Sequence, residues 1–459
     1  MKTERLNVLL IHPEISRTKY NFVGVIENEC LELEYISALF KEQGHIVSMY
    51  DGQVEDITVA EKIKSCKPDF VYVCGRTRQE NFMLEYCRIA KEYRKDCVTV
   101  IGGLHAQLCY ERMYREYVDY ILTTFDIFKL LDLADYHFSE KKSDLSKVEG
   151  ICYQTAEGWV CNPAVPFDIK RLPLPDRSYF YEHPDRYRYL ELEHAAWVRT
   201  AYSCPYRCEF CHRNKMNSGE YVCREIEDVV EEIANIASDN IYIVDDDFLF
   251  DTARLRAFIK GIRERNIKKR YICYGRTDFI ASNEELMAEL ESIGFYYILV
   301  GLESVEDAYL DRYHKKSNVD NNLKSIEICN RLGLHLMGMF IIDLDYKSKD
   351  FKRLYQWICR QELRHVAISI YTPEMGLPIY DVYRDRLITD NPSHWDYLHV
   401  VAKPEHMSVK RYYFHYYKLL IKLFLKAQRE GVYDFLDYKS YILSFLKNMV
   451  TSKRSHDDE

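Results

Sequence analysis

Three cysteines, Cys204, Cys208 and Cys211, stand in the spacing Cys-x3-Cys-x2-Cys, directly after an apolar run typical of a β-strand. Three thiolates this close in the sequence can hold three corners of a [4Fe–4S] cube and leave the fourth iron without a protein ligand. An open iron can bind and reduce a small molecule, whereas an electron-carrying cluster normally has all four irons ligated. The spacing therefore indicates a cluster with a reaction site.

A zinc site is the alternative interpretation of the same cysteines. Structural zinc takes four ligands, usually from Cys-x2–4-Cys pairs. His212 or Cys223 could supply the fourth ligand. The spacing alone leaves zinc, or a set of unpaired thiols, open.

The residues around the cysteines carry a family resemblance. Residues 201–213, AYSCPYRCEFCHR, resemble the cluster motif of the radical S-adenosylmethionine (SAM) superfamily, including the aromatic Phe210 before the last cysteine. The resemblance implies that Cys204, Cys208 and Cys211 ligate a [4Fe–4S] cluster and that the open iron binds the amino and carboxylate groups of SAM. It also implies that Phe210 packs near the adenine.

Residues 6–135 alternate apolar strands with helical patterns. Strands are predicted at 8–11, 46–50, 70–74, 98–101 and 120–122, and the clearest helices at 27–43 and 81–93. Continuous apolar strands separated by helices predict a parallel, doubly wound (Rossmann-like) sheet. Ligands of such sheets bind beyond the carboxyl ends of the strands, where two adjacent glycines let the backbone approach a bulky ligand.

Turns at these strand ends resemble the cobalamin-binding domain that precedes many radical SAM enzymes. They are Asp51-Gly52 and the Gly-Gly-x-His turn of Gly102, Gly103 and His105. The resemblance implies cobalamin bound by these residues. However, the Asp-x-His-x-x-Gly motif that supplies a lower cobalt ligand is absent, and Thr-Thr-Phe-Asp at 123–126 replaces an acidic-glycine turn. The second departure leaves open a vestigial, empty domain.

The rest of the chain is expected to form a connector, a barrel and a helical segment. Residues 136–194 contain a hairpin pattern at 150–161 and an extended Pro-rich crossing at 172–177. Six strands, at 196–203, 241–245, 271–276, 297–302, 336–342 and 366–371, then alternate with helices and predict a partial (β/α)6 barrel. The expected division of the chain is 1–135, 136–194, 195–375 and 376–459.

Polar residues at the ends of the barrel strands are the remaining site candidates. By the resemblance, Asp245 or Asp246 contacts the SAM amino group, although a run of three aspartates could also bind a cation or face solvent. Arg276 could grip a carboxylate of SAM or substrate as a catalytic-site residue, or form an ion pair with Asp278. Glu303 is expected to accept hydrogen bonds from ribose hydroxyls; the alternative is an acid at a helix N-terminus.

One strand end departs from the family pattern. Residues 340–345, Phe-Ile-Ile-Asp-Leu-Asp, stand where relatives usually carry a Gly-Leu-Pro-Gly turn. The role of Asp343 is therefore open.

Composition excludes several classes of protein. The chain has 459 residues, 47% hydrophobic and 29% charged, with a net charge of −9 that disfavours nucleic acid binding. It has no apolar run long enough to span a membrane and no signal-peptide pattern. Its fifteen scattered cysteines indicate a reducing cytoplasm rather than a disulfide framework. A basic amphipathic helix at 410–430 is expected to pack on the barrel rather than on a membrane or a lipid substrate.

The leading hypothesis is therefore an enzyme that cleaves SAM reductively at a [4Fe–4S] cluster and methylates an sp3 carbon with the help of cobalamin. One alternative is a radical rearrangement, cyclisation or oxidation without methyl transfer. Another is a non-catalytic iron–sulfur or zinc protein. A reductase or flavodoxin-type electron donor is expected as a partner, and the substrate is left open among small molecules, lipids and peptides.

Overall fold

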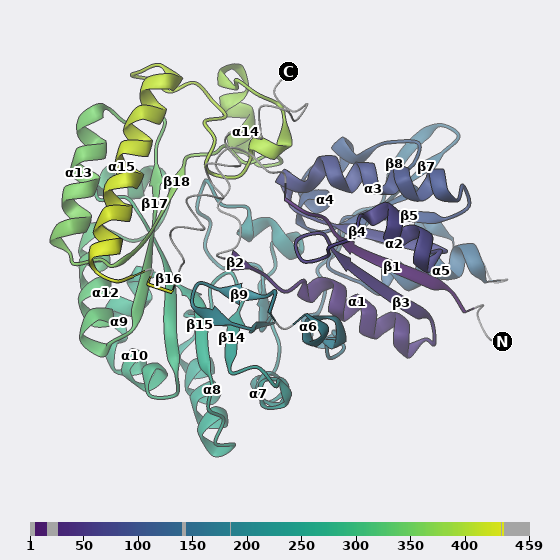
Figure 1. Cartoon of the computed structure of the whole chain (residues 1–459), viewed down its shortest axis with the longest axis horizontal. Coiled ribbons are helices and arrows are strands. Elements are labelled where there is room, and N and C mark those ends of the chain that lie inside the picture. Colours follow the sequence, from purple (N-terminus) through teal and green to yellow (C-terminus); the bar gives the residue numbers. More distant parts are fainter. Residues whose placement is uncertain (1–4, 16–25, 140–143, 184, 433, 436–459) are drawn as a thin grey trace.

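The computed structural model describes residues 5–15, 26–139, 144–183, 185–432 and 434–435. Two sheets, each covered by helices, lie side by side (Figure 1). The N-terminal sheet has the strand order β3-β1-β4-β5-β6-β7-β8 and the C-terminal sheet the order β11-β14-β15-β16-β17-β18. The prediction of a doubly wound sheet followed by a partial barrel is confirmed.

The first five strands of the N-terminal sheet are parallel. They are β1 (Asn7–His12), β3 (Ile46–Asp51), β4 (Phe70–Cys74), β5 (Val98–Gly102) and β6 (Tyr120–Leu122). The covering helices are α1 (Leu31–Glu42), α2 (Val59–Cys66), α3 (Glu80–Tyr93), α4 (Leu104–Cys109) and α5 (Lys129–Phe138). Val8 and Leu10 pack in the core that contains α1 and α5, while Leu9 and Ile11 pack in the core that contains α2 and α3. Helices on both faces therefore explain why the strands are apolar without alternation.

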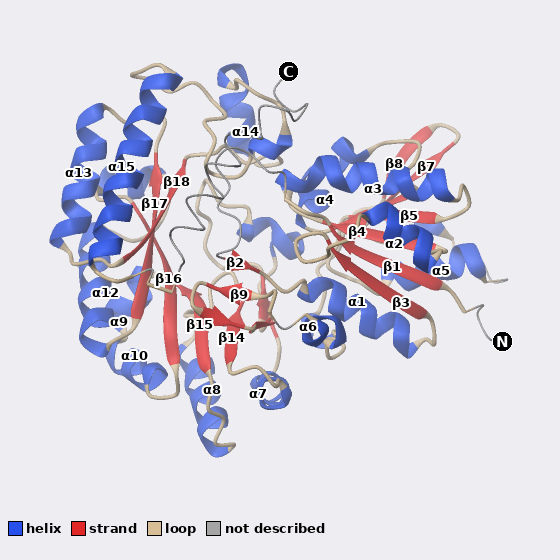
Figure 2. Ribbon diagram, viewed as in Figure 1, coloured by secondary structure: helices blue, strands red, loops and turns tan. Residues whose placement is uncertain are grey.

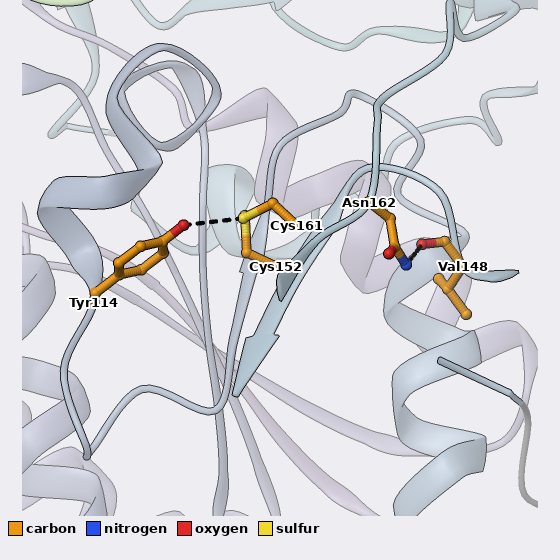
Figure 3. Close-up of a disulfide and its surroundings, with 5 residues drawn as sticks. All are labelled: Tyr114, Val148, Cys152, Cys161 and Asn162. Carbon is orange, nitrogen blue, oxygen red and sulfur yellow. Dashed lines mark hydrogen bonds between the residues drawn. A yellow bond between two sulfur atoms is a disulfide. The ribbon is translucent and has the colours of Figure 1, made fainter. Parts of the chain in front are cut away.

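An antiparallel hairpin extends this sheet. Strands β7 (Ile151–Thr155) and β8 (Gly158–Cys161) follow β6, at the positions where the sequence indicates a hairpin. Cys152 and Cys161 are paired residues of the two strands and form a disulfide, and the Tyr114 hydroxyl lies 3.2 Å from Cys161 Sγ (Figure 3). The cysteine pattern did not predict this bond.

The connection to the barrel contains short elements. Helix α6 (Ser178–Glu182) is followed by β9 (Arg188–Tyr189) and β10 (Leu192–Glu193). These two strands form a three-stranded sheet with β2 (Ile26–Glu27), which comes from before α1. The strand predicted at 196–203 is in fact two strands. Strand β11 (Ala195–Val198) joins the barrel, and β12 (Ala201–Tyr202) pairs with β13 (Val222–Cys223) outside it.

The six barrel strands are all parallel. After β11 they are β14 (Asn240–Ile243), β15 (Arg270–Gly275), β16 (Phe295–Glu303), β17 (His335–Ile342) and β18 (His365–Ile370). The helices around them are α7 (Ile226–Asn235), α8 (Thr252–Glu264), α9 (Thr277–Ser282), α10 (Glu284–Glu291), α11 (Asp307–Arg312), α12 (Val319–Leu332) and α13 (Ser348–Arg360). Helix α14 (Pro378–Tyr383) follows, and α15 (Val409–Arg429) lies beside α13 on the outside of the barrel (Figure 2).

A buried histidine at the amino end of the barrel strands gives a testable pH dependence. His365 is 5% exposed, and its ring packs on His335 and Tyr297. Neither ring nitrogen has a hydrogen-bond partner in the described part of the chain. Burial, helped by the charges of His335, Arg364 and Lys426, lowers its pKa to about 4. In the folded state His365 resists protonation, whereas in the unfolded state it does not. The contribution of neutral His365 to the free energy of unfolding is therefore complete above the unfolded pKa and is lost as the pH falls toward 4.

We expect His365→Phe to remove this dependence. Between about pH 7.5 and pH 5, the variant should gain about 2 kcal/mol in free energy of unfolding relative to the wild-type protein. Denaturant titrations at the two pH values measure the difference. The exposed His406→Gln should follow the wild-type curve, and an unchanged difference for His365→Phe would contradict the prediction.

Candidate active site

The three motif cysteines line one cavity. Its volume is about 300 Å³, and it lies at the carboxyl ends of the barrel strands with Cys204, Cys208 and Cys211 in its wall. The loop that carries them is fixed by a hydrogen bond from the Glu209 amide to the Tyr313 carbonyl, 3.0 Å, and by another from the Cys211 amide to the Cys208 carbonyl, 3.2 Å. Burial raises the pKa of Cys204 and of Cys211 to about 12.

The three cysteines fit a [4Fe–4S] cluster better than a single metal ion. Among the described residues, no three His, Cys, Asp or Glu side chains are arranged to hold one metal ion. In a [4Fe–4S] cluster each thiolate binds a different iron, so three cysteines need only to line one cavity from one loop. The observed placement of Cys204, Cys208 and Cys211 meets that requirement.

The three aspartates after β14 have different surroundings. Asp245 is buried and accepts hydrogen bonds from the Thr200 amide, the Ala201 amide and the Thr200 hydroxyl. It holds the turn between β11 and β12 and does not reach the cavity, so the predicted contact between Asp245 and a cofactor does not fit its position. Asp246 lines the cavity, 2.7 Å from the Arg213 guanidinium.

Asp247 is the residue of this run that the sequence interpretation missed. It lines the cavity and is 2% exposed, and neither carboxylate oxygen has a hydrogen-bond partner among the residues that the structure describes. Burial raises its pKa to about 8. An unpartnered buried carboxyl group is costly, and a bound cation would satisfy it. Asp247 is therefore the better candidate for a ligand ammonium group.

Arg276 and Glu303 both line the cavity. This agrees with the expectation that polar residues at the ends of the barrel strands lie at the site. Arg276 donates to the Lys315 carbonyl at 2.6 Å and to Asp278 at 3.0 Å, and its guanidinium lies 3.5 Å from the centre of the Tyr206 ring. Glu303 accepts a 2.7 Å hydrogen bond from Lys315. Burial lowers the pKa of Lys315, but the charges of Glu303 and Cys208, together with the hydrogen bond to Glu303, outweigh burial and the pKa is raised.

Phe210 also lines the cavity, and its ring meets Tyr313 edge to face. The Tyr313 hydroxyl donates to Asp343 at 2.7 Å. Asp343 is buried outside the cavity lining, where it also lies 3.4 Å from Arg312. Asp343, in the segment 340–345 that departs from the family pattern, thus holds Tyr313 in place, and Tyr313 packs against Phe210 in the cavity wall.

A second cavity, of about 150 Å³, lies at the carboxyl ends of the N-terminal strands. His12, Gly75, Arg76 and Gly103 line it from the ends of β1, β4 and β5. Counting only the main parallel strands, the sheet order is 2-1-3-4-5, and the cavity lies where this order reverses. Open α/β sheets bind ligands at that point.

Only one of the five residues predicted to bind cobalamin lines this cavity, namely Gly103. Asp51 is buried and accepts from the Tyr187 hydroxyl at 3.2 Å, and His105 is buried with Nε2 2.6 Å from Glu80. Neither of these side chains lines the cavity. Gly52 and Gly102 serve close packing within the protein. A Cβ would lie 2.6 Å from the Glu14 amide at Gly52 and 2.1 Å from the Tyr72 hydroxyl at Gly102.

The lining suits an amide-bearing ligand such as a corrinoid. Gln53, Gln79, Arg76, Arg78 and Arg199 bring hydrogen-bond donors to the cavity. His12 has partners at both ring nitrogens, Asp51 at Nδ1 and Gln79 at Nε2, which fits the absence of a histidine motif for cobalt. A whole corrinoid is larger than this cavity, so the lining accounts for contacts to only part of such a ligand.

Arg213 connects the two cavities, because it lines both of them. The only feature of the local sequence that indicates a role for Arg213 at the site is its position two residues after Cys211. Tyr397, from the segment before α15, also lines the larger cavity and donates its hydroxyl to the buried Glu374. Neither contact could be predicted from the sequence, because each depends on residues far apart in the chain.

Comparison with protein-family models gives two matches. Residues 198–358 match the radical SAM superfamily, and residues 27–126 match the B12 binding domain. Among curated proteins, the hopanoid C-3 methylase of Methylococcus capsulatus is 23% identical, over 89% of this chain and 78% of that protein. The anaerobic magnesium-protoporphyrin IX monomethyl ester cyclase of Rubrivivax gelatinosus is 23% identical, over 88% and 74%.

Two solved structures share the fold over most of the chain. The radical SAM methyltransferase TsrM from Kitasatospora setae, with cobalamin and a [4Fe–4S] cluster bound, has a TM-score of 0.67 at 17% identity and covers 88% of this chain and 84% of its own. The cobalamin-dependent SAM radical enzyme OxsB, with aqua-cobalamin and SAM bound, has a TM-score of 0.66 at 20% identity and covers 85% of this chain. The chain spans 56% of the length of OxsB.

Proposed function

Because the chain belongs to the radical SAM superfamily and carries a B12-binding domain ahead of its radical SAM domain, we propose that it methylates an sp3 carbon with SAM and cobalamin. The observation that carries the proposal is the pair of cavities. One is lined by three cysteines, the other lies at the ligand-binding end of the B12-binding domain, and Arg213 lines both. A methyl carrier in the second cavity would face a substrate in the first.

The cavity residues described above have the following roles in this proposal. Cys204, Cys208 and Cys211 hold the cluster, which supplies the electron for SAM cleavage, while cobalamin carries the methyl group. Phe210 packs beside the adenine and Glu303 accepts from the ribose, sharing its carboxylate with Lys315. Arg276 binds a carboxylate of SAM or substrate, and Asp247, with Asp246 beside it, accepts the SAM ammonium. That cation would lower the pKa of Asp247 again, because a nearby positive charge favours the carboxylate.

The proposal can be tested without knowing the substrate. Reduced, reconstituted enzyme with methyl-labelled SAM and cobalamin should form two products, 5′-deoxyadenosine and S-adenosylhomocysteine, and the label should appear on the extracted cobalamin. Chromatography with mass detection measures all three. Deoxyadenosine without labelled cobalamin would reject methyl transfer, and no SAM cleavage at all would favour a non-catalytic metalloprotein.

A radical rearrangement, cyclisation or oxidation is the second candidate. It is favoured by the Thr-Thr-Phe-Asp turn at 123–126 and by the similarity to a cyclase. It predicts SAM cleavage without label on cobalamin. An absorption spectrum of the protein supplied with hydroxocobalamin distinguishes an empty N-terminal domain from a loaded one.

The surroundings of the reaction are also part of the proposal. None of the described helices is long and apolar enough to cross a membrane. We place the enzyme in the cytoplasm, with a reductase or flavodoxin-type electron donor and a small-molecule, lipid or peptide substrate.

A further inference from the structure

Helix α15 has two opposite apolar faces, and only one of them packs against other residues that the structure describes. Tyr412, Tyr416, Leu419 and Leu423 are buried against the barrel, and the Tyr412 hydroxyl donates to the Ile342 carbonyl at 2.9 Å. On the other side Phe414 is 62% exposed, Ile421 60% and Leu425 44%. At 3.6 residues per turn, these three exposed side chains fall within about 40° of one another.

The same outward face is strongly cationic. The helix contains no Asp or Glu between Val409 and Arg429, in a protein whose net charge is −9. Its exposed cations are Lys410, Arg411, Lys418, Lys422 and Arg429. Within the described part of the chain, none of these five forms an ion pair; Lys418 and Lys422 instead lie over the rings of Phe414 and Tyr355. Neither these cations nor the exposed apolar side chains are among the residues of α15 that are buried against the barrel.

The combination of positive charge and apolar side chains on the outer face of α15 indicates what kind of partner this face fits. A second copy of this chain related by a twofold axis would place the same cations against one another, which is repulsive. Anionic lipid satisfies both parts of the face: the apolar side chains enter the boundary between headgroups and acyl chains, and the cations contact the headgroups. From these observations we infer that the outer face of α15 docks the protein on an anionic membrane surface.

The test uses the full-length protein and vesicles of phosphatidylcholine with or without phosphatidylglycerol. Cosedimentation should show binding to the phosphatidylglycerol vesicles that weakens as salt is raised, and little binding to phosphatidylcholine alone. The triple variant Phe414→Ser/Ile421→Ser/Leu425→Ser should bind at least about tenfold more weakly. Lys418→Gln/Lys422→Gln should bind about thirtyfold more weakly, because each lysine near an anionic surface contributes about a fivefold factor.

A matched control uses three apolar residues of similar exposure elsewhere. Val382 is 72% exposed, Ile388 42% and Val165 40%, so Val382→Ser/Ile388→Ser/Val165→Ser should bind as the wild-type protein does. Equal binding of the α15 triple variant and the wild type would overturn the inference, as would equal binding to neutral vesicles. A wild-type oligomer that the α15 triple variant dissociates would assign the face to a second copy. Absence of vesicle binding, with loss of thermal stability in that variant, would assign it to residues 436–459.

Discussion

Substituting Cys208 with alanine is expected to abolish reductive SAM cleavage. The cavity offers only Cys204 and Cys211 besides Cys208 on the cluster loop, and two thiolates cannot hold a cube that already has one open iron. Removing a residue that merely supports a metal ligand costs ten- to a hundredfold, so losing a ligand should lower 5′-deoxyadenosine formation by more than about a hundredfold. Iron content and the absorption of the reconstituted cluster should fall with it.

Two other cysteines serve as controls. Cys359 is exposed on α13, and Cys359→Ala should keep both cluster and activity. Cys223 lies on β13 and was the thiol considered as a fourth zinc ligand. Cys223→Ala should also keep the cluster. Loss of a stoichiometric zinc ion from both Cys208→Ala and Cys223→Ala would contradict the cluster assignment.

Local patterns predicted most of the fold, and long-range contacts account for what they missed. Strands β4 and β6 have the predicted bounds because each apolar run starts directly after an aspartate and ends before Gly75 or Thr123. The predicted strand 196–203 is interrupted between Val198 and Ala201 because Asp245, far along the chain, binds the Thr200 and Ala201 amides. Nothing in the sequence of residues 196–203 predicts that contact.

The same distinction applies to the candidate site. The spacing of Cys204, Cys208 and Cys211 is local, so the sequence already places them on one loop. The direction of a side chain at a strand end is not local. Asp51 turns inward to Tyr187, and His105 turns to Glu80. Lys315 reaches the cavity only because the fold brings it to Glu303. Positions at strand ends therefore identified the right regions, but contacts between residues far apart in the sequence determine which side chains line a cavity.

Arg177 shows how a residue with no expected ligand contact can still be critical. It ends the Pro-rich crossing and is buried among carboxylates from both halves of the molecule. Its guanidinium pairs with Glu29 at 2.5 Å, with Glu34 of α1 at 3.4 Å and with Glu232 of α7 at 2.6 Å, and it donates to the Trp197 carbonyl at 2.7 Å. Burial and the neighbouring Glu29 already raise the pKa of Glu34 well above its usual value, an effect that Arg177 opposes.

Replacing Arg177 with methionine is therefore expected to destabilise the protein by about 3–5 kcal/mol, because buried carboxylates lose their main counter-charge while the volume is kept. Denaturant unfolding at neutral pH measures the loss, and part of it should be recovered at lower pH, where the acids can be protonated. Arg186 provides the matched control. Its side chain is 44% exposed and pairs with Asp56 at 2.9 Å, so Arg186→Met should cost no more than about 1 kcal/mol. Equal losses for the two variants would show that the buried cluster does not join the two halves as the contacts imply.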